Sequence, residues 1–301
     1  MNDAELRDLL EGQIPRIAGA LMEIAAPTIR IYLDPADDGA IPVGASKMGG
    51  GADLPPGVEW PSWHEPMAFI AQLNLAEVAP YDREGALPDH GLLSFFYETD
   101  GEPLYAERWG LPEETPYDEA YYHKPVHLSW RVLYHEGDPA TFIRHQIPPE
   151  VNEMARYSPC AARFAGELTL PDVDGPQMAP LELTRDERTT LIDLDAEINH
   201  GSWEEGGHHL LGYHYIYSTT LADIDREAQG IPFDAERERD RRDKLRREEE
   251  ASRRWRLLLQ VSSSDDTQMD WAGGGVLYYF VEREALRDRG FPRVWVDLGF
   301  L

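Results

Sequence analysis

Cysteine is almost absent from this 301-residue chain, which contains Cys160 and no other. A single cysteine excludes an intrachain disulfide, a CxxC redox pair and a zinc site built from several cysteines. Because many small secreted domains depend on disulfides, the composition favours a cytoplasmic location.

The sequence also lacks a long apolar run and a segment typical of a signal peptide. Its first residues, MNDAELRDLLEG, are acidic, whereas a signal peptide begins with basic residues followed by an apolar stretch. No apolar stretch reaches the roughly 20 residues that a membrane-spanning helix needs. We therefore expect neither export nor a membrane anchor.

Basic residues are few relative to acidic ones, and the formal net charge is −28. Such a surface repels phosphate backbones and anionic lipids, which argues against a nucleic-acid partner and against membrane docking. It could instead attract a basic protein. An acidic partner protein of the immunity or inhibitor type is therefore one hypothesis, and it predicts salt-sensitive binding.

Familiar catalytic motifs are missing as well, since the chain has no GxSxG elbow, no HExxH helix and no Rossmann fingerprint. His123 and His127 have the spacing of paired zinc ligands on a helix. They lie in a segment expected to be extended, where four residues span roughly 13 Å, too far for one metal ion. The sequence predicts no metal site and no cofactor; enzymatic activity stays open, and the missing motifs favour a protein that is not an enzyme.

Two pairs of apolar runs are what the sequence does contain. Residues 67–75 and 92–97 flank a turn rich in Pro, Asp and Gly, and residues 255–261 and 276–281 flank a polar, Gly-rich turn. Each pair is typical of a core β-hairpin. Gln260 echoes Gln72, so we predict an internal pseudo-duplication of this hairpin.

The remaining periodicities predict a mainly antiparallel sheet with a few helices. Helices are expected in the N-terminal segment 1–26, after the capping box of Thr184 and Glu187, and over the charged segment 234–254. Further strands are expected at 28–33, 126–134, 142–147, 164–170, 208–217 and 294–298. Because strands and helices do not alternate regularly, we predict an α+β fold, organised as a single domain over residues 1–301.

The segment SKMGGG is the first candidate site. Its glycines allow backbone amides to converge on an anion, and Lys47 supplies a positive charge. A P-loop needs Gly-Lys-Ser/Thr leading into a helix, and here the lysine precedes the glycines. Two interpretations remain: a structural turn, or the rim of a groove in which Ser46, Lys47, Gly49 and Gly50 contact a ligand.

An acidic turn in the second hairpin is the next candidate. Asp265, Asp266 and Asp270 could hold a hard cation, and together with a histidine such as His209 they would suit a metal-assisted hydrolase. The aspartates lack EF-hand spacing, and aspartate is also common in solvated turns. The hydrolase hypothesis requires the fold to bring these groups within reach of one ion.

Polar side chains beside the core strands complete the candidates. Gln72 and Gln260 must form hydrogen bonds if they are buried, and such residues usually hold backbone in place rather than catalyse. Tyr213 and Trp271 lie close in sequence to the other candidates. We include all four as possible ligand contacts.

The order of these motifs resembles the YwqG-like family of uncharacterised bacterial proteins. The family's SKxGG-x-P-x-LP-x-x-x-x-WP opening is matched by SKMGGGADLPPGVEWP, and its FLAQINL strand by FIAQLNL. Its LPxxGxLxFFY element matches residues 87–97, and its LLLQ-DSD strand and turn match residues 257–266. The matches cover residues 46–301, and the resemblance implies the fold of the family but no activity, because none is assigned to it.

The chain departs from this family at two places. Where relatives continue HxLLGYP with further polar groups, His209–Tyr213 is followed by HYIY, and the family's Trp-Gly-Asp becomes Trp271-Ala272-Gly273. If the family has a site at these positions, this chain has lost part of it.

The sequence therefore predicts a binding or protein-interaction module in which the Gly-rich loop lines a groove near the acidic turn. The alternatives are the metal-assisted hydrolase with Asp265, Asp266 and His209, and the acidic partner protein. The sequence leaves the oligomeric state open.

Overall fold

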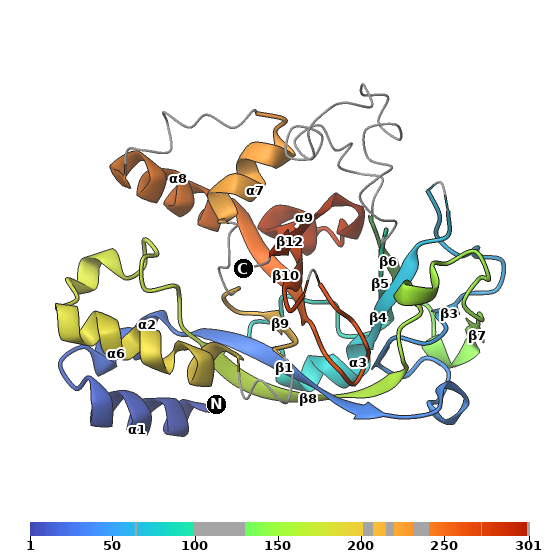
Figure 1. The fold of residues 1–301 in the computed structure, drawn as a ribbon, viewed down its shortest axis with the longest axis horizontal. Helices are drawn as coiled ribbons and strands as arrows, with labels where there is room; N and C mark the ends of the chain where they lie inside the picture. The colour runs from blue at the N-terminus through green and yellow to red at the C-terminus, as the bar shows by residue number, and fades with distance from the viewer. Residues whose placement is uncertain are drawn as a thin grey trace.

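The computed structural model describes residues 1–63, 65–98, 130–200, 207–214, 220–231, 241–271 and 273–299. Its centre is a ten-stranded sheet in which every pair of neighbours is antiparallel (Figure 1). From edge to edge the strands are β12 (Val294–Gly299), β11 (Val276–Glu282), β10 (Trp255–Ser262), β9 (His209–Leu211), β1 (Ala26–Pro35), β8 (Cys160–Thr169), β2 (Lys47–Met48), β4 (Ala68–Asn74), β5 (Leu92–Tyr97) and β6 (Trp130–His135). The predicted α+β class with a mainly antiparallel sheet is confirmed.

Two long strands join the two halves of this sheet. β1 and β8 pair along ten residues, from Ala26 opposite Thr169 to Pro35 opposite Cys160. The β1 segment is rich in β-branched and aromatic residues, which favour a strand. A small second sheet pairs β3 (Asp53–Leu54) with β7 (Ile143–Arg144).

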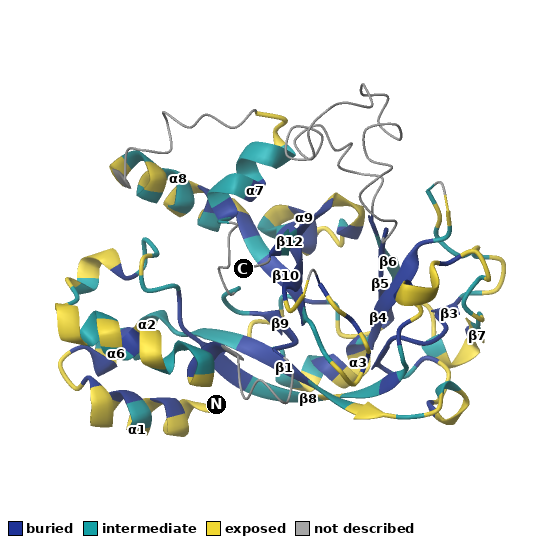
Figure 2. Cartoon of the chain, viewed as in Figure 1, coloured by how far each residue is buried: buried dark blue, intermediate teal, exposed yellow. Residues whose placement is uncertain are grey.

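The ten-stranded sheet curls until its two edges nearly meet. The indole Nε1 of Trp130 on β6 donates a hydrogen bond of 2.8 Å to the carbonyl oxygen of Val294 on β12. The rings of Trp130 and Trp295 are 5.8 Å apart, and those of Phe95 and Tyr279 are 5.0 Å apart. Most buried apolar side chains of both hairpins form one core inside the curl, whereas Phe69 and Phe96 pack in a separate cluster with Ala52 and Leu54. The buried strands are dark blue in Figure 2.

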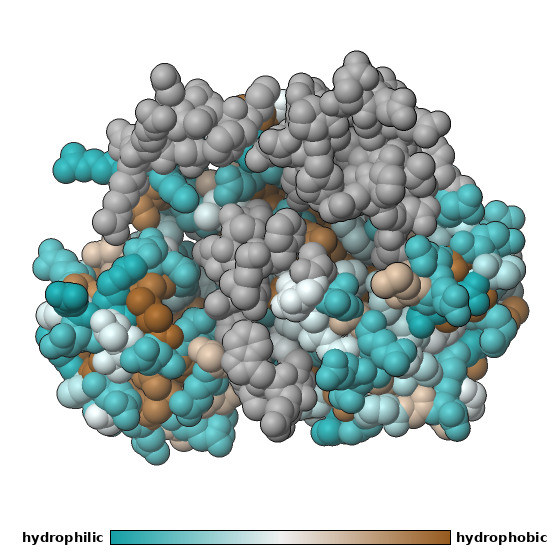
Figure 3. Space-filling model, in the orientation of Figure 1, coloured by the Kyte–Doolittle hydropathy of each residue, from teal (hydrophilic) through white to brown (hydrophobic). Residues whose placement is uncertain are grey.

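The helices lie outside this core. α1 (Asp3–Gln13), α2 (Ala18–Ile24) and α6 (Arg185–Asp195) form a second apolar cluster against the end of β8. Asn2 caps α1, and the capping box of Thr184 and Glu187 starts α6, as the sequence predicted for α6. The described surface is mainly hydrophilic in Figure 3, with a hydrophobic area over α6, where Ile192 is 52% exposed.

Four shorter or charged helices complete the described fold: α3 (Leu75–Val78), α7 (Leu221–Ala228), α8 (Arg241–Arg254) and α9 (Arg283–Arg287). α8 lies in the charged segment expected to be helical and carries ion pairs between neighbouring turns, such as Arg246 with Asp243 and Glu250. None of the described helices combines the length and the apolar character that crossing a bilayer requires.

Several predicted elements differ in extent. The strand expected at 164–170 begins earlier, at Cys160 of β8, because β1 extends far enough to pair with it. The strand expected at 142–147 is limited to β7, since only Ile143 and Arg144 meet the short β3. Residues 126–129, with His127, and the earlier His123 lie outside the described residues.

Candidate functional site

The Gly-rich segment forms an internal part of the sheet. Its first residues make β2, which lies between β4 and β8, and the side chain of Lys47 is fully buried. The Lys47 ammonium forms an ion pair with Asp38 and lies 5.6 Å from the centre of the Phe69 ring. Burial lowers the pKa of Lys47, and the contact with Asp38 opposes this shift.

The glycines after β2 allow close packing of backbone against backbone. Gly49 and Gly50 have positive φ angles, and their amides donate to the carbonyl oxygens of Ile70 (3.0 Å) and Tyr157 (2.9 Å). A Cβ atom on Gly49 would lie 2.2 Å from the carbonyl oxygen of Ser158. The geometry is that of a tight structural turn, the first of the two interpretations of this segment.

A buried polar network holds the turn in place. Gln72 donates to the carbonyl oxygen of Ala45 (2.9 Å) and to Asp53 (2.7 Å), and it accepts from the Asp53 amide (2.9 Å). Arg144 binds both oxygens of Asp53 at 2.8 and 2.9 Å. Burial raises the pKa of Asp53, but the hydrogen bonds from Arg144, Gly44 and Gln72 lower it overall.

Gln260 repeats the role of Gln72 in the second hairpin. It pairs with His209 as Gln72 pairs with Lys47, and it donates to the carbonyl oxygen of Gly207 (2.9 Å), two residues before His209. Ala45, the acceptor for Gln72, also lies two residues before Lys47. The two glutamines therefore attach each hairpin to its neighbouring short strand in the same way.

The residues next to these pairs correspond as well. The Asn74 amide donates to Ser46 Oγ at 2.8 Å, and the Ser262 amide donates to His208 Nδ1 at 3.2 Å. The donors Asn74 and Ser262 each lie two residues after a glutamine. The acceptors Ser46 and His208 each lie one residue before the residue that pairs with that glutamine. Each hairpin also has a register shift at the same distance before its glutamine.

The groups of the hydrolase hypothesis are not brought together. The ring nitrogens of His209 lie 3.2 and 3.1 Å from the carbonyl oxygens of Gly207 and Tyr213. Asp265 and Asp266 are exposed in the turn between β10 and β11. No group of three or more His, Cys, Asp or Glu residues in the described part of the chain could hold a metal ion.

The space between the Gly-rich segment and the acidic turn is filled by residues 157–160. Gly50 donates to Tyr157, and the Ser158 amide donates to the Thr267 carbonyl oxygen at 2.8 Å. Trp271 is 4% exposed and packs its ring against Tyr97 and Tyr157. These contacts place the sequence's candidate groove inside packed protein.

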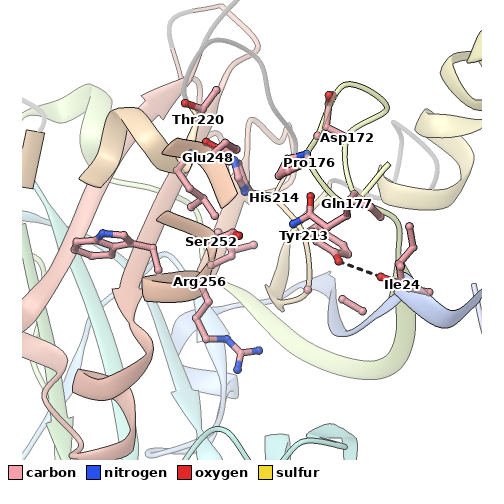
Figure 4. Close-up of a pocket in the computed structure, with 18 of the residues that line it drawn as sticks. Ile24, Asp172, Pro176, Gln177, Tyr213, His214, Thr220, Glu248, Ser252 and Arg256 are labelled. Carbon is pink, nitrogen blue, oxygen red and sulfur yellow. Dashed lines mark hydrogen bonds between the residues drawn. The ribbon is translucent and has the colours of Figure 1, made fainter. Parts of the chain in front are cut away.

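A cavity of about 770 Å³ lies elsewhere, between the α7–α8 pair, β10 and the loop of residues 171–177. Figure 4 shows Glu248 and Thr220 on one side, and Gln177 and Tyr213 on the other. The Tyr213 hydroxyl donates to the Ile24 carbonyl oxygen at 3.0 Å. Of the candidate residues named from the sequence, only Tyr213 lines this cavity.

Two arginines at one wall give the cavity a cationic region. Arg256 on β10 binds Glu84 at 2.9 Å, and Arg283 at the start of α9 donates from Nε to the Ser252 carbonyl oxygen at 3.2 Å. Burial lowers the pKa of Arg283, and the charge of Arg256 lowers it further. The buried Nε of Arg256 has no partner among the described residues.

The acidic groups across the cavity are already engaged by backbone amides. Glu248 on α8 accepts from the amides of Leu221 (3.2 Å) and Ala222 (2.8 Å), and thereby caps the first turn of α7. Asp172 accepts from the Asp174 amide at 2.7 Å. Burial raises the pKa of both Glu248 and Asp172.

Sequence reasoning missed the arginines of this cavity, although one signal was present. Arg256 is the single charged residue inside the apolar run WRLLLQV, and an arginine in a core strand calls for a local partner. The cavity itself gave no signal, because its walls come from segments that are distant in sequence.

A family model described as "Domain of unknown function (DUF1963)" matches residues 46–299. The chain belongs to this family. The DUF1963 match begins at Ser46, the acceptor for Asn74, and includes both hairpins with their glutamines. No curated protein matches the chain.

Some residues that pair with the core of the DUF1963 region lie outside that region. Asp38, the counter-ion of Lys47, and the central strand β1 precede residue 46. The cavity likewise takes one wall from residues 23–27 and the rest from inside the DUF1963 region.

Proposed function

We propose that this DUF1963 protein is a binding module that holds a small molecule in the cavity beside α7 and α8. The observation that carries this proposal is the cavity's volume of about 770 Å³. Small-molecule sites typically measure about 300–1,000 Å³ and combine apolar walls with a few polar groups. Trp255, Leu257 and Leu221 supply apolar wall here, and Tyr213, Gln177 and the arginines supply polar groups.

The sequence also favoured a binding function, but it placed the site at the Gly-rich segment rather than in this cavity. Lys47, Gln72 and Gln260 are fully buried and use their polar atoms to hold backbone or to pair with Asp38. A ligand would have to displace those contacts. The cavity needs no such displacement, because it is already open.

The binding test uses a variant that fills the cavity. Ser252 lines it from α8, so Ser252→Phe should occupy the volume, whereas Ser252→Ala leaves it open. The proteins would be incubated with a metabolite extract and examined by native mass spectrometry, with urea unfolding as a check on folding. We expect the wild type and Ser252→Ala to retain a ligand that Ser252→Phe does not retain.

Equal retention of the same ligand by folded Ser252→Phe would contradict the proposal. So would the absence of any bound mass from all three proteins.

We also propose that the chain is a YwqG-like member of the family and a single domain with an internally duplicated hairpin. The equivalent hydrogen bonds of Gln72 and Gln260 support the duplication, and one apolar core that includes both hairpins supports the single domain. The matched motifs support the name, since SKMGGG includes β2 and FIAQLNL includes all of β4 except Ala68.

A further inference from the structure

The wall formed by Arg256, Arg283 and Glu84 carries more positive than negative charge. Arg256 is paired to Glu84, whose side chain is 43% exposed, while the Arg256 side chain is 11% exposed. Arg283 contributes a second guanidinium that is held by a backbone carbonyl oxygen rather than by a carboxylate. Two guanidiniums and one carboxylate leave an excess of one positive charge in a protein whose net charge is −28.

Guanidinium groups bind planar oxyanions through paired N–H donors, and these charge-assisted hydrogen bonds strengthen where water is partly excluded. A monoanion balances the excess charge. A phosphate dianion would exceed it and would place a second negative charge beside Glu84.

The rest of the cavity limits what the anion can be attached to. Trp255 and Leu257 stand next to Arg256 on β10, and Leu221 faces the cavity from α7. The remaining walls carry four carboxylates and one further cation, Lys244, so they would repel a second anionic group; the carboxylates are Glu23, Asp172, Asp174 and Glu248. The ligand's body is therefore uncharged and largely apolar.

We propose that the cavity binds an amphipathic monocarboxylate, whose carboxylate contacts Arg256 and Arg283 and whose apolar body packs against Trp255, Leu257 and Leu221. This inference rests on the proposed binding function and adds the chemical class of the ligand.

Ligand-observed NMR with three matched probes tests this assignment: phenylacetate, phenylacetamide and phenyl phosphate. We expect phenylacetate to bind more tightly than the other two. Arg283→Gln should weaken its affinity about tenfold or more, as expected for the loss of a hydrogen bond to a charged group. Arg287→Gln, which changes an exposed arginine one turn further along α9, should leave the affinity unchanged.

A second variant keeps the test informative if Arg283→Gln does not fold. Glu84→Gln removes the competing carboxylate from a partly exposed position, so phenylacetate should bind more tightly to it than to the wild type. Reduced or unchanged affinity in Glu84→Gln would overturn the carboxylate assignment.

The other outcomes separate this inference from the binding function. If phenylacetate and phenylacetamide bind equally, and Ser252→Phe abolishes both, the cavity is a binding site and the carboxylate assignment is wrong. A preference for phenyl phosphate would also overturn it. If no probe binds the wild type, the monocarboxylate assignment falls, and the metabolite experiment with Ser252→Phe decides on the cavity separately.

Discussion

At the scale of single residues, the polar groups in the core act on backbone. Gln72 and Gln260 each bridge a core strand to the segment before a short strand. Lys47 and Asp53 are buried charges with partners, which compensates part of their desolvation. A buried side chain of this kind stabilises one arrangement of the strands, because any other would leave it unpaired.

The contribution of one such buried side chain, His208, to stability can be tested through its pH dependence. It is fully buried, and burial, with the charge of Arg30, lowers its pKa from 6.5 to about 4. Its neutral form is therefore favoured in the fold, and its contribution to stability is complete above about pH 6.5 and lost as the pH falls toward 4. We expect the wild type to lose up to about 3 kcal/mol of unfolding free energy from this group over that interval.

Urea unfolding at a series of pH values measures this effect. His208→Asn keeps an acceptor for the Ser262 amide but does not titrate, so its stability should fall less than that of the wild type. His90→Asn is the control, because His90 is about half exposed and its pKa is raised by Asp89. Parallel pH profiles for the wild type and His208→Asn would contradict the expectation.

At the scale of elements, the turn after β2 needs glycine at Gly49 because of what packs against it. Leu211 lies two residues after His209, as Gly49 lies two residues after Lys47, and it also has a positive φ of 60°. A side chain is therefore compatible with this backbone conformation at Leu211. At Gly49, the carbonyl group of Ser158 approaches so closely that it leaves no space for a side chain.

Gly49→Ala should consequently be more destabilising than strain alone explains. Its Cβ would lie 2.2 Å from Ser158, so we expect strain and overpacking together to cost roughly 3 kcal/mol. Gly57 also has a positive φ, but a Cβ added there would meet no atom within 4 Å, and Gly57→Ala should cost only about 1 kcal/mol. Thermal or urea unfolding compares the two, and equal costs would show that the packing is not limiting.

At the scale of the whole molecule, the curled sheet makes one core from two hairpins. The Tyr279 hydroxyl on β11 approaches the Phe96 carbonyl oxygen on β5, and Trp130 bonds across the nearly closed edges. Because both hairpins bury their apolar side chains in the same cluster, neither should unfold alone.

Hydrogen exchange in the Gln260→Ala variant tests this coupling. Removing the Gly207 contact from a fully buried position should cost about 1–3 kcal/mol. We expect the slowest amides of β4 and β5 to exchange faster by the same factor as those of β10 and β11, about tenfold or more. Gln229→Ala, at an exposed site after α7, should change neither hairpin, and acceleration confined to β10 and β11 would contradict a single cooperative unit.

The sequence by itself determined the local structure of this protein. Apolar runs and the capping box at Thr184 specify strands and helices through interactions within a few residues. Only the tertiary structure decided where Lys47 and the aspartates lie and where a cavity opens. Burial of Lys47 depends on Asp38 and Phe69, and the cavity depends on segments from residue 23 to residue 283, whose meeting no local pattern encodes.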